Sequence, residues 1–449
     1  MSTVEHRRAA TANACKLCTP LGASLALRGI AGAVPLLHGS QGCSTYIRRY
    51  LIGHFREPVD IAASNFSEQA AIFGGGRVLT LALQNLIRQY RPSLIGVATT
   101  CLAETIGDDL PALVAEARAT LGEDLPPVVT VSTPSYSGNH AEGFHRTVRA
   151  LLEQLAESTP THDRLLLLAG AQSPADLRHL RELVEAYGLG VDLLPDYSDN
   201  LDGGADGRYQ AMPAGGTPLS AIRAAGGARA CLQLGATLPT TEDAAALIDR
   251  RFQRPVYRCD LPVGLRASDR FFEELAHISG RAMPATLAAD RSRLLDSYID
   301  GHKYVSGRRV LIYGEEDLVV ALTGFALEVG LRPVVVGGGA CSRRMAGRLD
   351  DLGLDLAACH IISDADFTDL EQLGRDAGVE LIIGHSKGYW LSRRLEQPLV
   401  RVGFPIHDRL GGARVRLCGY AGTQALFDRI ANALITAAQD ANPVGYMCM

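Results

Sequence analysis

Three cysteines in the first quarter of the chain stand out because of the residues beside them. Cys18 lies in CTPLGA, Cys43 in HGSQGC and Cys101 in GVATTCLAETIGDDL. Each is next to Gly, Pro or Thr rather than inside an apolar run, as expected for thiols at loop tips. Thiolates held in this way suit iron or zinc, and above all iron–sulfur clusters. Three thiolates do not complete a four-coordinate site, so further ligands must come from elsewhere.

The other seven cysteines give a weaker signal. Cys15 forms a CxxC pair with Cys18, a spacing that redox and zinc sites also use. We expect Cys418, in the alternating run VRLCGY, to be a core residue. The six that show no paired spacing are Cys231, Cys259, Cys341, Cys359, Cys418 and Cys448.

Length and composition indicate a globular protein of several domains. A chain of 449 residues suggests two to four domains. The net charge of −5 gives no basic surface for nucleic acid. No apolar run reaches the roughly 18 to 20 residues that span a bilayer, and the first residues do not resemble a secretory signal. We therefore expect a cytoplasmic protein without nucleic-acid or membrane partners, whose cysteines stay mostly reduced.

A repeating pattern of strand, turn and helix must position these cysteines. Apolar runs at 93–100 and 164–171 predict buried strands followed by helix-period segments, and the segments 309–330 and 381–395 repeat this strand-turn-helix pattern. We expect one helix from Glu104 through ALVAEARATL, and a later helix that Ser173 caps with Pro174 in its first turn. The alternation predicts an α/β fold of three doubly wound domains with parallel sheets.

We place the domain boundaries near residues 160 and 305. The predicted domains are 1–160, which carries the cysteine loops, 161–305, and a Rossmann-like domain at 306–449. No low-complexity linker separates them, so we expect close packing. The run Gly337–Gly339 lacks GxGxxG spacing and a following Lys-Ser/Thr, which favours a plain turn over a nucleotide site.

Parallel sheets gather ligands at the carboxyl ends of their strands. Cys101 falls directly after a predicted strand and directly before a helix. Cys43 follows the loop 39–42, whose two glycines let the backbone approach a bulky inorganic ligand. Glu104, Asp108 and Asp109 open the next helix, where we expect them to favour its N-terminal dipole.

Six motifs in order resemble the β-type subunit of nitrogenase component 1, the molybdenum–iron protein family. The resemblance runs from about Asn13 to the C-terminal region and is densest before residue 145. The motifs are CTPLGA, HGSQGC, YIRRYLIGHFREP, NFSEQAAIFGGG, TTCLAETIGDDL and TPSYSGNH. This resemblance implies an α2β2 heterotetramer in which the β-type and a homologous α-type subunit share an eight-iron P-type cluster (8Fe-7S). Cys18, Cys43 and Cys101 match the three β-side ligands, and the partner supplies the remaining thiolates.

The resemblance also assigns roles to three other residues. Ser135 matches a serine that ligates the oxidised cluster, although it is equally suited to cap the turn at Pro134. Tyr46 matches an aromatic near the electron route, and Phe73 a residue where an ATP-dependent 4Fe-4S reductase docks. Ordinary packing is the alternative for both aromatics. Residues 54–58 (HFREP) are interpreted as framework.

Two branches of the family remain open. Cys101 and Ser135, together with KLCTPLGASLALRG, look most like nitrogenase-like methylthio-alkane reductases, which reduce C–S bonds on a large iron–sulfur cofactor in the partner subunit. The stretches LLPDYSDNLDGG and GGTPLSAIRAAGGA look more like cofactor-assembly scaffolds. A protochlorophyllide-type reductase has only the shared fold in its favour. We predict an electron-relaying oxidoreductase subunit and nominate no catalytic residue on this chain.

Overall fold

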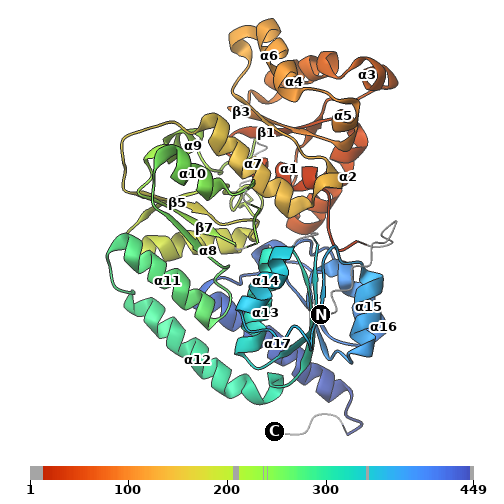
Figure 1. Ribbon diagram of the computed structural model, residues 1–449, viewed down its shortest axis with the longest axis vertical. Coiled ribbons are helices and arrows are strands. Elements are labelled where there is room, and N and C mark those ends of the chain that lie inside the picture. Colours follow the sequence, from red (N-terminus) through yellow and green to blue (C-terminus); the bar gives the residue numbers. More distant parts are fainter. Residues whose placement is uncertain (1–13, 206–211, 236, 240, 340–342, 445–449) are drawn as a thin grey trace.

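The chain forms three α/β units, each built on its own parallel sheet (Figure 1). The structure is a computed structural model that describes residues 14–205, 212–235, 237–239, 241–339 and 343–444. Parallel sheets with helices on both faces confirm the predicted fold class. No helix among these described residues is long and apolar enough to cross a membrane.

The first sheet carries the region of the predicted cysteine loops. Its strand order is β2-β1-β3-β4, with every pair parallel. β1 and β3 are buried along their whole length, as expected where helices cover both faces. The strands are β1 (Ala33–His38), β2 (Ala62–Ala63), β3 (Leu94–Thr99) and β4 (Val128–Val131).

Helices cover the two faces of this sheet. α1 (Thr19–Arg28) and α7 (His140–Leu155) share one core with one face, while α4 (Gly76–Tyr90) and α6 (Leu110–Leu121) share another core with the opposite face. Three shorter or more exposed helices follow strand ends or loops: α2 (Gln41–Phe55), α3 (Glu68–Phe73) and α5 (Cys101–Ile106).

The single helix predicted from Glu104 onward is wrong: two helices occupy this segment. α5 ends at Gly107, which adopts φ +79°, a left-handed conformation that glycine adopts without strain. α6 then begins after Asp109, whose side chain accepts a hydrogen bond from the Ala112 N–H. A glycine C-cap and an aspartate N-cap so close together interrupt the apolar periodicity.

The second and third sheets repeat the arrangement. The second has the order β6-β5-β7-β8, and the third β11-β10-β9-β12-β13. As predicted, Ser173 caps α8 by accepting a hydrogen bond from the Asp176 N–H at 3.0 Å. The strands are β5 (Arg164–Leu168), β6 (Gly190–Leu193), β7 (Ala230–Leu234), β8 (Val256–Cys259), β9 (Arg309–Gly314), β10 (Arg332–Gly338), β11 (His360–Ile362), β12 (Leu381–Gly384) and β13 (Leu399–Arg401). The helices are α8 (Pro174–Ala186), α9 (Leu219–Ala224), α10 (Ala244–Phe252), α11 (Leu265–Ser279), α12 (Ala285–Val305), α13 (Glu316–Glu328), α14 (Arg343–Asp351), α15 (Phe367–Asp376), α16 (Tyr389–Leu395) and α17 (Gly419–Asp440).

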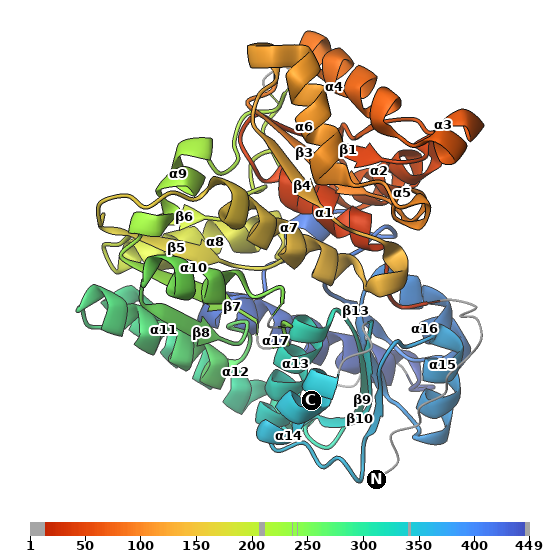
Figure 2. The same ribbon diagram turned by 45° about the horizontal axis from the view of Figure 1, so that its top comes forward.

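The three units pack closely, as the missing linkers predict. One continuous core of buried residues runs through all three. The last helix, α17, leaves the third sheet and packs along α12 (Figures 1 and 2). A Cβ atom at Gly301 in α12 would lie only 2.4 Å from the Phe427 ring of α17, so glycine is required for this contact. The boundaries near 160 and 305 remain predictions.

Most of the scattered cysteines belong to the core. Cys231, Cys259, Cys359 and Cys418 are all buried. Cys418 is a core residue as predicted, although it precedes α17 and does not lie in a strand. Cys341 and Cys448 lie outside the described residues.

Candidate functional site

The three predicted thiols come together at the N-terminal ends of three helices. Cys18 is the residue before α1, Cys43 lies in the first turn of α2, and Cys101 is the first residue of α5. All three are half-buried. They are close enough for a charge on Cys18 to interact with Cys43 and Cys101, and for one on Cys43 to interact with Cys101.

The electrostatics of this thiol cluster (Cys18, Cys43 and Cys101) favour a cationic ligand. Burial raises the pKa of Cys18 to about 11, and the neighbouring Cys43 and Cys101 thiols raise it further. Backbone hydrogen bonds oppose this rise in part. Burial also raises the pKa of Cys43, with Cys101 as the second cause. Three thiolates here repel one another, and a bound metal centre removes that repulsion because ligation deprotonates thiols. The donor set therefore fits iron.

The thiol cluster does not form a site for a single metal ion by itself. Within the described part of the chain, no three His, Cys, Asp or Glu side chains are arranged to hold one ion. That a partner supplies the remaining ligands stays a prediction. All three residues are partly accessible on this chain.

A network of hydroxyls and one carboxylate positions Cys101. Glu104 Oε1 accepts hydrogen bonds from Thr99 Oγ1 and Ser132 Oγ, each at 2.5 Å. The Thr133 N–H donates to Thr99 Oγ1 at 2.8 Å. These bonds join the carboxyl ends of β3 and β4 to α5. The dipole role predicted for Glu104 is therefore secondary, because its side chain binds these hydroxyls.

Ser135 contacts the thiol cluster through its backbone. Its N–H donates to Cys101 Sγ at 3.2 Å. The alternative role as a cap of the turn at Pro134 belongs to Ser137, whose N–H and hydroxyl both donate to the Pro134 carbonyl. Ligation of iron by the Ser135 hydroxyl stays a prediction.

The loop before Cys43 needs its glycine for close packing. A Cβ atom at Gly39 would lie 1.9 Å from Thr100 Oγ1, so no larger residue fits beside the strand end that precedes Cys101. Ser40 then caps α2 by accepting a hydrogen bond from the Gly42 N–H at 3.2 Å. The glycine thus allows this loop to pack closely against the strand end before Cys101, while the approach of its backbone to an inorganic ligand stays a prediction.

A buried hydrogen-bond network around His38 holds the loop that follows α3. His38 Nε2 lies 3.0 Å from Asp108 Oδ2, and His38 Nδ1 lies 3.1 Å from Ser64 Oγ. Asp108 also accepts from the Gly75 N–H, just past the exposed end of α3. Asp108 is thus an anchor for this loop, in place of the predicted dipole role. Sequence reasoning missed the network because its members lie far apart in the chain.

The two predicted aromatics are exposed. Phe73 is 84 % exposed at the end of α3, beside the similarly exposed Ile72. Tyr46 is 48 % exposed on α2, its ring centroid lies 4.7 Å from that of Tyr50, and it is near enough to Cys18 for their charges to interact. Phe73 and Tyr46 are therefore surface residues of this chain, which is compatible with docking for Phe73 and with an electron route at a subunit interface for Tyr46. Those roles remain predictions.

Cys15 does not join the thiol cluster. It is 2 % exposed and belongs to the core of the third unit. Its Sγ atom lies 3.5 Å from His385 Nε2. Although Cys15 and Cys18 have CxxC spacing, their thiols therefore lie in different places: Cys15 in the core of the third unit and Cys18 in the thiol cluster.

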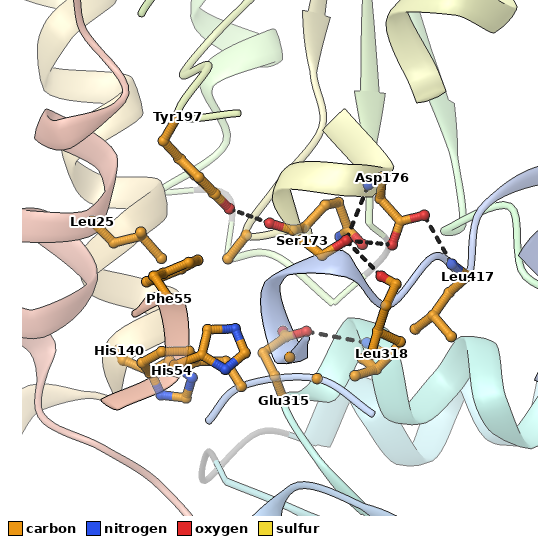
Figure 3. Close-up of a pocket in the computed structure, with 16 residues that line it drawn as sticks. Leu25, His54, Phe55, His140, Ser173, Asp176, Tyr197, Glu315, Leu318 and Leu417 are labelled. Carbon is orange, nitrogen blue, oxygen red and sulfur yellow. Dashed lines mark hydrogen bonds between the residues drawn. The ribbon is translucent and has the colours of Figure 1, made fainter. Parts of the chain in front are cut away.

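A separate cavity of about 60 Å³ lies where the three units meet (Figure 3). The N-termini of α8 and α13 both reach it, but the Asp176 N–H of α8 already donates to Ser173 Oγ, and Glu315 accepts from the Asp317 and Leu318 N–H groups of α13. The Asp176 carboxylate accepts from the Leu417 N–H. Burial lowers the pKa of His54 to about 3 and that of His140 to about 4, so both imidazoles are neutral. The predicted framework role of His54 fits, because its Nδ1 accepts from the Ile406 N–H at 2.9 Å.

Comparison with known proteins identifies the class. Residues 18–435 match the family described as Nitrogenase component 1 type Oxidoreductase, and the chain belongs to this family as a β-type member. It is 33 % identical to the nitrogenase molybdenum-iron protein beta chain of Clostridium pasteurianum, covering 96 % of this chain and 95 % of that protein.

A curated relative and a solved structure also match nearly the whole chain. The nitrogenase iron-molybdenum cofactor biosynthesis protein NifN of Mesorhizobium japonicum is 35 % identical, covering 95 % of this chain and 91 % of that protein. The solved structure "Nitrogenase Cp1 at pH 6.5" matches with a TM-score of 0.94 and 32 % identity, covering 99 % of this chain and 98 % of that chain. Because the chain is similar both to a molybdenum-iron protein chain and to a cofactor biosynthesis protein, these comparisons do not distinguish the branches of the family.

Proposed function

We propose that the chain is the β-type subunit of a nitrogenase-like reductase, a methylthio-alkane reductase that cleaves C–S bonds reductively. It pairs with a homologous α-type subunit in a cytoplasmic α2β2 heterotetramer. Cys18, Cys43 and Cys101 bind one half of an eight-iron P-type cluster at the interface between the subunits. When bound, such a cluster accepts and passes on single electrons.

The observation that carries this proposal is the convergence of three half-buried thiols on one surface. Cys18, Cys43 and Cys101 come from loops that are 25 and 58 residues apart, yet their charges interact. The Ser135 N–H bond to Cys101 adds a donor of the kind that tunes cluster potentials. Three thiolates do not complete the coordination of such a cluster, so a partner's ligands are needed.

The other predicted residues fit the same function. Phe73 on α3 offers an apolar contact for an ATP-dependent 4Fe-4S reductase, which supplies the electrons. Tyr46, half-exposed and near enough to Cys18 for their charges to interact, belongs to the electron route. The large iron–sulfur cofactor and the substrate chemistry belong to the α-type partner.

A second candidate is a cofactor-assembly scaffold. The 35 % identity to a cofactor biosynthesis protein over 95 % of this chain favours it. The two candidates differ at Cys101: an electron relay requires it as a cluster ligand, whereas the resemblance to scaffold subunits implies no ligand at this position.

Iron analysis of the heterotetramer purified from its native host tests the proposal. We expect Cys101→Ala to lose the interface cluster, seen as lower iron content and a lost electron paramagnetic resonance signal, together with methane release from dimethyl sulfide. Cys359→Ala is the matched control, a buried thiol of the third unit. Unchanged iron and turnover in Cys101→Ala would rule out the relay. An iron-loaded complex that releases no hydrocarbon but donates its cofactor to a nitrogenase would establish the scaffold.

A further inference from the structure

The chain segment just before Cys18 is bound by the third unit. We call residues 14–16 the N-terminal strap. Ala14 pairs with Asp366, and the Cys15 N–H donates to the Ala365 carbonyl at 2.8 Å. The strap is therefore hydrogen-bonded to the loop that contains Ala365 and Asp366, which lies far away in the sequence.

Lysines make further polar contacts with the strap. Lys387 Nζ donates to the carbonyl oxygens of Ala14 and Lys16, and Lys16 Nζ forms an ion pair with Asp364 Oδ1 at 2.7 Å. The sequence has 44 Lys and Arg residues, of which only three are lysines, and two of those three meet here. A single flexible ammonium group can reach two carbonyls at once, which suits lysine to this position.

The strap occupies the place where a Rossmann-like sheet binds its ligand. Asp364 and Ala365 follow β11, Gly339 follows β10, and His385 and Lys387 follow β12. These are carboxyl ends on both sides of β9, the point at which the strand order reverses. A Cβ atom at Gly339 would lie 3.3 Å from Lys16 Cβ, so the strap lies directly against this edge.

The fixed strap leads straight into the thiol cluster. Leu17 follows the strap, and its carbonyl accepts a hydrogen bond from the His140 N–H of the first unit at 3.0 Å. Cys18 comes next. Its backbone position is therefore set from two sides, by the third unit through the strap and by α7 through Leu17.

We propose that Lys387 is a positioning residue for the cluster: by holding the strap in the ligand crevice of the third unit, it fixes Cys18 where iron binds. This inference rests on the proposed function, because it assumes that Cys18 is an iron ligand. It assigns to the third unit a part in cluster binding, although that unit contributes no thiol to the cluster. Loss of the Lys387 contacts leaves the strap attached only by the Cys15 N–H bond to Ala365, the Ala14–Asp366 bridge and the Lys16–Asp364 ion pair, and so weakens the hold of the third unit on Cys18.

The test compares Lys387→Met with Lys303→Met in the purified heterotetramer. Lys303 is the third lysine and is exposed on α12, far from the strap in sequence and structure. Two readouts are needed: the rate at which N-ethylmaleimide labels Cys15, located by mass spectrometry, and the iron content with the cluster's paramagnetic signal. Cys15 reports strap release because it is buried only while the strap is bound.

We expect Lys387→Met to raise the labelling rate of Cys15 by at least about tenfold, as loss of charge-assisted hydrogen bonds implies, and to lower the interface iron by more than half. Lys303→Met should change neither, and Lys387→Arg should retain most of both. If Lys387→Met fails to assemble, Asp364→Asn replaces it. This variant removes the charge that pairs with Lys16 in a half-exposed ion pair, and so weakens the attachment of the strap.

The outcomes separate this inference from the proposed function. An unchanged labelling rate for Cys15 in Lys387→Met contradicts the holding role. Fast labelling with full iron contradicts the positioning of Cys18, provided that Cys18→Ala loses the cluster. If Cys18→Ala itself keeps the cluster, the proposed function fails instead, and with it the assumption made here.

Discussion

The backbone N–H of Ser135 donates a hydrogen bond to the Sγ atom of Cys101 across 3.2 Å. This bond joins the turn after β4 to the first residue of α5. Because it uses the backbone, it persists whatever side chain stands at position 135, except proline, which has no N–H. The bond and the hydroxyl of Ser135 can therefore be tested separately.

Ser135→Ala and Ser135→Pro should differ in their effect on the cluster. Ser135→Ala keeps the N–H···S bond and should leave the reduced cluster unchanged, affecting only oxidised states in which the hydroxyl binds iron. Ser135→Pro removes a donor to a thiolate, which destabilises the more negative, reduced state and should lower the reduction potential. Redox titration of the paramagnetic signal measures both. Position 135 begins a short helical turn, where proline is tolerated.

Glu104 should prove necessary for the position of Cys101. Glu104→Ala leaves the hydroxyls of Thr99 and Ser132 without their acceptor, at a cost of about 1–3 kcal/mol. Glu104→Gln is the matched control, because both bonds go to Oε1 and the amide oxygen can replace it. We expect lower iron content and a lower thermal midpoint in the alanine variant only. Equal iron in the two variants would contradict the positioning role.

The strands and the thiols could be predicted from sequence because their signals are local. β3 is a short apolar run, Ser173-Pro174 is a recognisable helix start, and Cys101 stands where one element passes into the next. The break between α5 and α6 was missed because Gly107 and Asp109 override an apolar periodicity that otherwise continues. Local chemistry thus decides the boundaries of elements more sharply than periodicity does.

The contacts between distant segments could not be predicted. His38 and Asp108 are 70 residues apart, and Lys387 is more than 370 residues from Ala14. No periodicity links such residues, since only the packing of separate units brings them together. For the same reason the CxxC spacing does not predict that Cys15 packs into the core of the third unit beside His385.

The exposed end of α3 should bind the reductase without stabilising the fold. Phe73 and Ile72 are 84 % and 73 % exposed, so Phe73→Ala with Ile72→Ala should change the free energy of unfolding by less than about 0.5 kcal/mol per site. Exposed apolar anchors of this kind dominate docking energies, and we expect the apparent affinity for the reductase to fall by at least about tenfold. Stopped-flow electron transfer at varied reductase concentration measures this. Leu410→Ala, at an equally exposed leucine, is the control.

The junction of the three units should lose stability in acid because of His140. Burial lowers the pKa of His140 to about 4, below the ordinary value of 6.5. The unfolded chain therefore binds a proton at this residue before the folded chain does, so the stability present above pH 6.5 is lost as the pH falls towards 4. The full loss from this one residue is on the order of 3 kcal/mol.

His140→Phe should remove that acid dependence at little cost near neutral pH. The Nδ1 atom of His140 has no hydrogen-bond partner within the described residues, so an apolar ring of similar shape loses no bond there. We expect the thermal midpoint of the variant to match the native protein at pH 7.5 and to exceed it at pH 5. His302→Phe, at an exposed position on α12, should show the native pH dependence. If His140→Phe is as acid-sensitive as the native protein, the proton enters at another group and the neutral state of this imidazole is not what stabilises the junction.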